Sequence, residues 1–98
     1  MKLPLEFDIR AEEELAEACD FYENRRAGYG KRLALEVDSS LIAIRRNPKA
    51  ARKVFRDIRR LVISEFPFCI YYRIDPQSIF IVSVFHTSRN PKIWQSRA

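Results

Sequence analysis

The residues best suited to chemistry or binding gather in the second half of the chain. His86 is the only histidine, and an imidazole can take or give a proton near neutral pH. It follows two apolar, strand-like runs, residues 68–74 and 79–85, and so stands at a strand end, where site residues are often found. Cations and aromatic residues surround it in the sequence. The candidate binding residues are Arg59, Arg60, Tyr71, Arg73, His86, Arg89 and Trp94.

These residue types suit recognition of an anionic or aromatic partner. Guanidinium groups hold phosphates or carboxylates through paired hydrogen bonds, and Arg59, Arg60 and Arg73 fall on expected strands that could face an open surface. Trp94 could stack on a base or insert into a groove of a partner. If the chain is a ribonuclease, the candidate catalytic residues are Arg60, Arg73, His86 and Arg89.

Each candidate also has a structural interpretation. His86 could hydrogen-bond the C-terminal turn, and we favour that interpretation over proton transfer. Trp94 could close the end of the core by packing on the strand pair, which is as well supported as a contact with a partner. The strand arginines could form a solvated set of charges.

Charge is distributed unevenly along the chain. Residues 1–24 carry two basic and eight acidic residues, a net charge of −6. Residues 25–98 carry 16 basic and five acidic residues, a net charge of +11. Such a basic surface favours an anionic partner, either nucleic acid or an acidic segment of a protein. The alternative is a soluble basic surface that serves no specific partner.

Several functional classes are not expected. No run of about 18 apolar residues is present, and the first residues lack the apolar core of a signal peptide, so we expect a cytoplasmic protein that does not span a membrane. Cys19 and Cys69 lie in apolar patterns without a CxxC spacing, which predicts reduced packing residues. The carboxylates near the N-terminus lack metal-ligand spacing with His86, so we predict no metal and no small-molecule cofactor.

The apolar pattern predicts a single α+β domain over residues 1–98, in the order β-α-α-β-β-β. Helices are expected over about 10–24 and 31–46. Asn47 is expected to cap the second helix in the left-handed conformation, before Pro48. Strands are expected over 5–9, 59–64, 68–74 and 79–85, as a small, mostly antiparallel sheet with the helical hairpin on one face. The first strand is expected beside the last, and residues 91–97 are expected to form one helical turn.

Alternation assigns faces to the last two strands. Phe68, Ile70, Tyr72 and Ile74 should face the core under the helices, and Cys69, Tyr71, Arg73 and Asp75 a more open face. In the last strand Ile79, Ile81 and Phe85 should share one side, with Phe80, Val82 and Val84 on the other. Both sets are apolar, so this strand should be central and covered on both sides.

Several segments resemble the RelE/ParE superfamily of small bacterial toxins in their order and spacing. They are AEEEL at 11–15, FYE at 21–23, GKRL at 30–33, NP at 47–48, DIRR at 57–60, FPFCIYYR at 66–73, VFH at 84–86, RNP at 89–91, and Trp94. The resemblance implies the toxin of a type II toxin–antitoxin pair. It also implies an antitoxin whose C-terminal segment wraps the toxin, and we expect that segment across the helical hairpin and the sheet edge.

The resemblance leaves two branches open. RelE-like members cleave messenger RNA on the ribosome, and their pattern has arginines where this chain places Cys69 and Thr87, and a tyrosine near Ile93 and Trp94. ParE-like members poison DNA gyrase without known catalysis. These departures favour a non-catalytic gyrase inhibitor, with a ribosome-dependent mRNA endoribonuclease as the alternative. A third hypothesis is a non-toxic, basic nucleic-acid-binding module.

Overall fold

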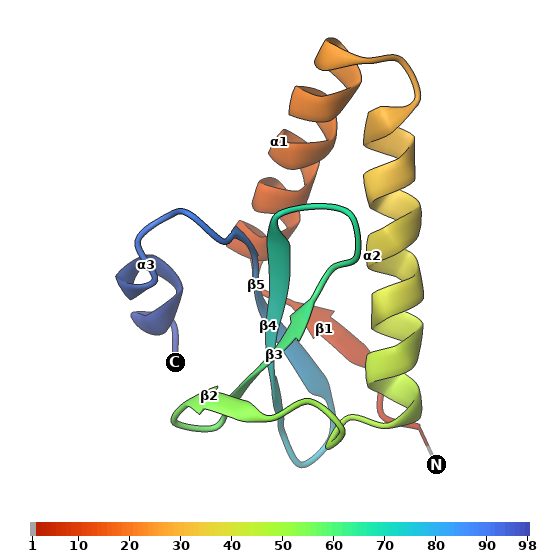
Figure 1. Cartoon of the computed structure of the whole chain (residues 1–98). Coiled ribbons are helices and arrows are strands. Elements are labelled where there is room, and N and C mark those ends of the chain that lie inside the picture. The colour runs from red at the N-terminus through yellow and green to blue at the C-terminus, as the bar shows by residue number, and fades with distance from the viewer. Residues whose placement is uncertain (1) are drawn as a thin grey trace.

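The structure, a computed structural model, describes residues 2–98 (Figure 1). The chain begins with a short strand and a helical hairpin, and then forms the rest of a sheet. The elements are β1 (Leu5–Phe7), α1 (Ile9–Arg25), α2 (Tyr29–Arg46), β2 (Lys53–Phe55), β3 (Ile58–Val62), β4 (Phe68–Ile74), β5 (Ile79–His86) and α3 (Lys92–Gln95). No helix within residues 2–98 is long and apolar enough to cross a membrane.

The helix ends follow their capping residues, with one difference from expectation. The Asp8 side chain accepts a hydrogen bond from the backbone N–H of Arg10 and so caps α1. Asn47 ends α2, but its φ of −146° and ψ of 77° are not left-handed, so that prediction was wrong. The reason is Pro48, because a proline ring disfavours helical conformations of the residue before it.

The cap at Asp8 gives a pH-dependent contribution to stability. Hydrogen bonds from the Arg10 guanidinium lower the pKa of the Asp8 carboxyl from 3.8 to about 2. A carboxyl group whose pKa is lower in the folded than in the unfolded protein stabilises the fold at pH values above its unfolded-state pKa. This contribution is lost as the pH falls towards the folded-state pKa.

We therefore expect Asp8→Asn to destabilise the protein at pH 7 by about 1 kcal/mol, because Asn caps helices well but carries no charge. The difference between wild type and variant should shrink as pH falls from about 4 to about 2. Urea unfolding of both proteins at a series of pH values measures this difference in the free energy of unfolding. A difference that is constant across this window would contradict the assignment.

The turn between the helices depends on Glu23 and two glycines. The Glu23 carboxylate accepts hydrogen bonds from the backbone N–H groups of Gly28, at 2.8 Å, and Gly30, at 3.0 Å. Gly28 has a φ of +91°, a conformation that favours glycine. Gly30 lies against α1, and a Cβ atom there would be 2.4 Å from the backbone oxygen of Cys19. The hairpin therefore closes only because residue 30 has no side chain.

Gly30→Ala is expected to destabilise the protein by about 1–3 kcal/mol, because the methyl group forces the two helices apart. The clash opposes the gain of up to about 1 kcal/mol that alanine otherwise gives inside a helix. Chemical denaturation measures the change. Gly28→Asn is the matched control, since no atom lies within 4 Å of a Cβ there and asparagine tolerates positive φ. Equal stability of Gly30→Ala and wild type would contradict the close approach.

The sheet has the strand order β1-β5-β4-β3-β2. β1 runs parallel to β5, with Leu5 opposite Ile79, and the other neighbours are antiparallel. The predicted α+β class, the position of the first strand beside the last and the helical hairpin on one face are confirmed. β2 (Lys53–Phe55) was not among the predicted strands, the second of which was expected to begin at residue 59.

Both faces of the sheet are covered. Under α1 and α2 lies the larger core, built on residues such as Leu33, Val37, Ile70 and Tyr72. On the opposite face a smaller core is formed by Ile58, Cys69, Tyr71, Val82, Phe85 and Trp94. The expectation that this second face is more open was wrong at Cys69 and Tyr71, which are 2% and 7% exposed. Trp94 of α3 stacks on Tyr71 and belongs to the same cluster as Cys69. Figure 1 shows α3 on the side of the sheet away from α2.

A β-bulge changes the sidedness of β5. Tyr71 pairs with Ser83 but Tyr72 pairs with Ile81, which leaves Val82 as the extra residue. After the bulge, Val84 joins the larger core and Phe85 the smaller one. The assignment of these two residues by strict alternation was therefore wrong, although the strand is covered on both sides as predicted.

Candidate binding site: a basic pocket beside the C-terminal turn

Side chains from β2, β3, β4, β5 and the C-terminal segment line a cavity of about 290 Å³. We call it the basic pocket, and its lining residues include Arg60, Tyr71, His86, Thr87, Arg89 and Trp94. None of its lining residues is acidic. Five of the seven predicted binding residues therefore meet here, around a cavity rich in hydrogen-bond donors. Such a lining suits an oxyanion, either a carboxylate or a phosphate.

Trp94 forms one wall of the pocket by packing within the protein. Its ring stacks on Tyr71 at 3.9 Å between centroids and 17° between planes, and meets the edge of Phe55 at 5.9 Å. Trp94 is only 3% exposed. Its packing therefore agrees with the structural interpretation, in which Trp94 closes the end of the core. Its indole Nε1 is buried and has no hydrogen-bond partner within residues 2–98, although a buried donor normally has one.

Tyr71 and Cys69 are held neutral beside Arg60. Burial raises the pKa of the Tyr71 phenol, and the nearby Arg60 guanidinium opposes part of that rise. Burial also raises the pKa of the Cys69 thiol, which makes it a packing group and a poor nucleophile. The phenol of Tyr71, which lines the pocket, is therefore neutral, and Arg60 and Arg89 bring positive charge to the lining.

The imidazole of His86 is oriented by its own loop. Its Nδ1 accepts a hydrogen bond from the backbone N–H of Ser88 at 3.0 Å and lies 2.8 Å from the Ser88 Oγ. An Nδ1 that accepts assigns the proton of the neutral ring to Nε2. The ring also meets the edge of Phe68 at 5.1 Å. These contacts agree with the structural interpretation, and the ring can still donate from Nε2.

The arginines divide into two groups. Arg89 lies over the Phe85 ring at 4.9 Å and lines the pocket together with Arg60. Arg59 is outside the pocket and donates to the backbone oxygen of Ala51 at 2.6 Å, which fixes the segment after α2. Arg73 is also outside, paired with Asp75 at 2.9 Å. The sequence thus predicted the pocket's cations but could not separate them from these two structural arginines.

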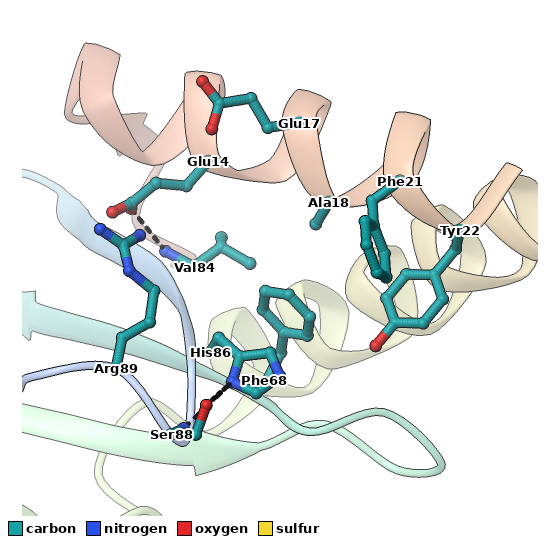
Figure 2. Close-up of a pocket in the computed structure, with 10 residues that line it drawn as sticks. All are labelled: Glu14, Glu17, Ala18, Phe21, Tyr22, Phe68, Val84, His86, Ser88 and Arg89. Carbon is teal, nitrogen blue, oxygen red and sulfur yellow. Dashed lines mark hydrogen bonds between the residues drawn. The ribbon is translucent and has the colours of Figure 1, made fainter. Parts of the chain in front are cut away.

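A second cavity of about 410 Å³, which we call the α1 groove, lies between α1 and the ends of β4 and β5 (Figure 2). Figure 2 shows Glu14, Glu17 and Phe21 on α1, with Phe68 and His86 across the groove from them. Phe21 is 51% exposed. His86 and Arg89 line both cavities and separate them. Sequence reasoning missed this groove. Phe21 was a signal for it, because a large aromatic residue outside the buried side of its helix indicates a candidate contact surface.

Within residues 2–98, no group of three or more His, Cys, Asp or Glu side chains is placed to hold a metal ion. Sequence reasoning also missed Glu14 and Arg97, which form a buried ion pair. Their contacts are described below.

A helical hairpin on a five-stranded mixed sheet is the fold of RelE/ParE-like toxins. The sequence model of the family described as "ParE toxin of type II toxin-antitoxin system, parDE" matches residues 5–91. The chain therefore belongs to this family, and the resemblance found in the sequence is confirmed.

Solved structures show the same fold. A chain of the chromosomal ParDE toxin–antitoxin system from P. aeruginosa superposes with a TM-score of 0.78 at 16% identity, covering 89% of this chain and 98% of that one. A mutant of the E. coli toxin RelE, in complex with an antitoxin RelBc peptide, gives a TM-score of 0.59 at 17% identity, covering 100% and 96%. No curated protein sequence matches the chain.

Proposed function

We propose that this type II toxin inhibits growth by binding and poisoning DNA gyrase, and that its cognate antitoxin neutralises it. The observation that carries the proposal is Cys69, a buried and neutral residue in the strand position where the RelE-like pattern has an arginine. Trp94 is similarly buried near the position of the RelE-like tyrosine. Membership of the ParE family supports the same choice.

The basic pocket is the surface that we assign to the target. Arg60 and Arg89 offer charged donors, His86 can donate from Nε2, and no lining residue carries an acidic group that would repel a carboxylate or phosphate. These groups bind an anion without needing to transfer a proton. DNA gyrase is a cytoplasmic enzyme, so the proposal places the toxin in the cytoplasm.

The antitoxin is expected on the helical hairpin and the sheet edge. The α1 groove offers apolar wall residues, and Phe21 there is half exposed. At the sheet edge, β2 pairs only with Ile58 and Arg59, and Val62 farther along β3 is 63% exposed. Apolar segments of an antitoxin can cover these residues. Acidic segments can reach residues 45–60, which carry eight basic side chains and one acidic side chain.

The test is a gyrase supercoiling assay with the purified chain, titrated with and without the product of the neighbouring gene. Inhibition that this product relieves is the expected result. A soluble, folded chain that leaves supercoiling unchanged at high concentration would refute the gyrase proposal. The control for folding is the circular dichroism spectrum of the same sample.

A second candidate, ribosome-dependent mRNA cleavage, is favoured by the donor-rich lining of the basic pocket, which also suits a scissile phosphate. If it holds, Arg60→Ala or His86→Ala should abolish cleavage of ribosome-bound mRNA while the fold persists. Arg73→Ala is the comparison outside the pocket and should retain cleavage. The third hypothesis, a non-toxic nucleic-acid-binding module, predicts no growth arrest on expression.

A further inference from the structure

A buried ion pair joins the first helix to the end of the chain. Glu14 on α1 accepts from both terminal nitrogens of Arg97, with Nη1–Oε1 and Nη2–Oε2 distances of 3.0 Å. The two side chains are 12% and 6% exposed. Breaking a buried pair by removing one charge is strongly destabilising, because the other charge is left unpaired in a poorly solvated place.

The same pair satisfies the polar groups of the bulge in β5. Glu14 Oε1 also accepts from the Ser83 hydroxyl at 2.7 Å and from the backbone N–H of Val84 at 3.3 Å. Arg97 Nη1 donates to the backbone oxygen of Val82 at 3.2 Å. Polar groups from three consecutive residues of the bulged strand are therefore bonded to Glu14 or Arg97.

These contacts set two walls of the basic pocket. The bulge turns Phe85 into the smaller core and leads directly into His86. Arg97 anchors the segment that carries α3, so it holds Trp94 on Tyr71. Glu14 does not line the basic pocket, yet both walls are held by its carboxylate.

We propose that Glu14 is a positioning residue for the basic pocket, and that its carboxylate keeps the bulge and the C-terminal turn closed over Tyr71. This position needs a side chain that only accepts hydrogen bonds, because every group that contacts the Glu14 carboxylate donates one. A glutamine amide of the same shape brings two N–H donors into this set. It leaves Arg97 without its counter-charge, and α3 is expected to detach.

The test compares Glu14→Gln with Glu17→Gln in the full chain. Glu17 lies one turn along α1 and lines the same α1 groove, but it makes no hydrogen bond or ion pair with Arg97. Trp94 is the only tryptophan, so its fluorescence reports on α3 directly. Acrylamide is the suitable quencher, because it is neutral and insensitive to the protein's positive charge.

For Glu14→Gln we expect a clear rise in the quenching constant and about tenfold or faster amide hydrogen exchange over residues 87–98. Glu17→Gln should match wild type in both measurements. A folded Glu14→Gln variant whose Trp94 is shielded as in wild type would overturn the proposal.

A second variant decides the matter if Glu14→Gln fails to fold. Arg97→Met removes the pair from the terminal segment and leaves α1 unchanged. It should expose Trp94 while the helical circular dichroism of α1 and α2 persists. Unchanged quenching in Arg97→Met would count against the proposal as directly as it would in Glu14→Gln.

A functional test of the same variants rests on the proposal that the protein binds gyrase. It can therefore fail even if Glu14 positions the basic pocket. If the basic pocket binds gyrase, Glu14→Gln should require about tenfold more protein for half-inhibition of supercoiling than Glu17→Gln does. Increased quenching of Trp94 together with unchanged inhibition would support the positioning role of Glu14. The same result would refute the basic pocket as the gyrase-binding surface.

Discussion

Reversing the charge of both pocket arginines, with Arg60→Glu and Arg89→Glu together, is expected to raise the concentration needed for half-inhibition of gyrase by about 30-fold or more. Truncating one member of a desolvated, hydrogen-bonded charge pair costs about 2–5 kcal/mol of binding energy, and each 1.4 kcal/mol is tenfold in affinity. The fold should persist, because Arg89 is exposed and Arg60 is only partly buried. A supercoiling assay measures the effect.

The matched control is Arg46→Glu with Lys49→Glu, which changes the net charge equally on exposed positions away from the pocket. We expect a shift of only a few-fold there, caused by weaker long-range attraction and reduced by added salt. Equal losses in the two double variants would show that the basic pocket has no specific role. Full activity of the pocket variant would refute the pocket as the gyrase-binding surface.

Replacing Trp94 with alanine is expected to reduce the free energy of unfolding by about 3–5 kcal/mol, the usual range for a buried aromatic residue. The loss has two sources, the apolar area that Trp94 buries and its stacking on Tyr71. For a small domain whose total stability is about 5–15 kcal/mol, that is a large fraction. Urea denaturation followed by circular dichroism is the appropriate measurement, because the variant has no tryptophan.

Ile93→Ala is the control for the Trp94 variant. Ile93 precedes Trp94 in the same helical turn but is 38% exposed, so its truncation should cost less than about 1 kcal/mol. A similarly small cost for Trp94→Ala would mean that α3 contributes little to the smaller core. In that case Trp94 would be available to a partner, as the alternative interpretation of the sequence allows.

Periodicity in the sequence was sufficient for most of the fold. Leu33 and Val37 recur at helical spacing and are fully buried in α2. In residues 79–85 the side chains on both sides of the strand are apolar, which predicted a strand covered on both faces. β2 was missed because it is only three residues long and begins with a lysine. The bulge at Val82 was invisible because alternation assumes one residue opposite one residue.

The candidate site was predicted in composition but not in arrangement. Residue types alone indicated cations and aromatic groups, and five of the seven predicted residues do line one cavity. The sequence could not show that Arg59 binds backbone oxygens, because nothing local marks the loop that it meets. Glu14 and Arg97 are 83 positions apart, and no local pattern couples residues at that separation.

The pairing of residues that lie far apart in the sequence has a consequence for the order of folding. The helical hairpin depends on contacts between residues close in sequence and can form early. β1 must pair with β5, and Glu14 with Arg97, across most of the chain length. Contacts between distant residues form late because closing a long loop costs entropy, so the sheet and the basic pocket are completed after the helical hairpin. A folding molecule therefore passes through a stage in which its larger core is partly exposed and its basic pocket has not yet been assembled.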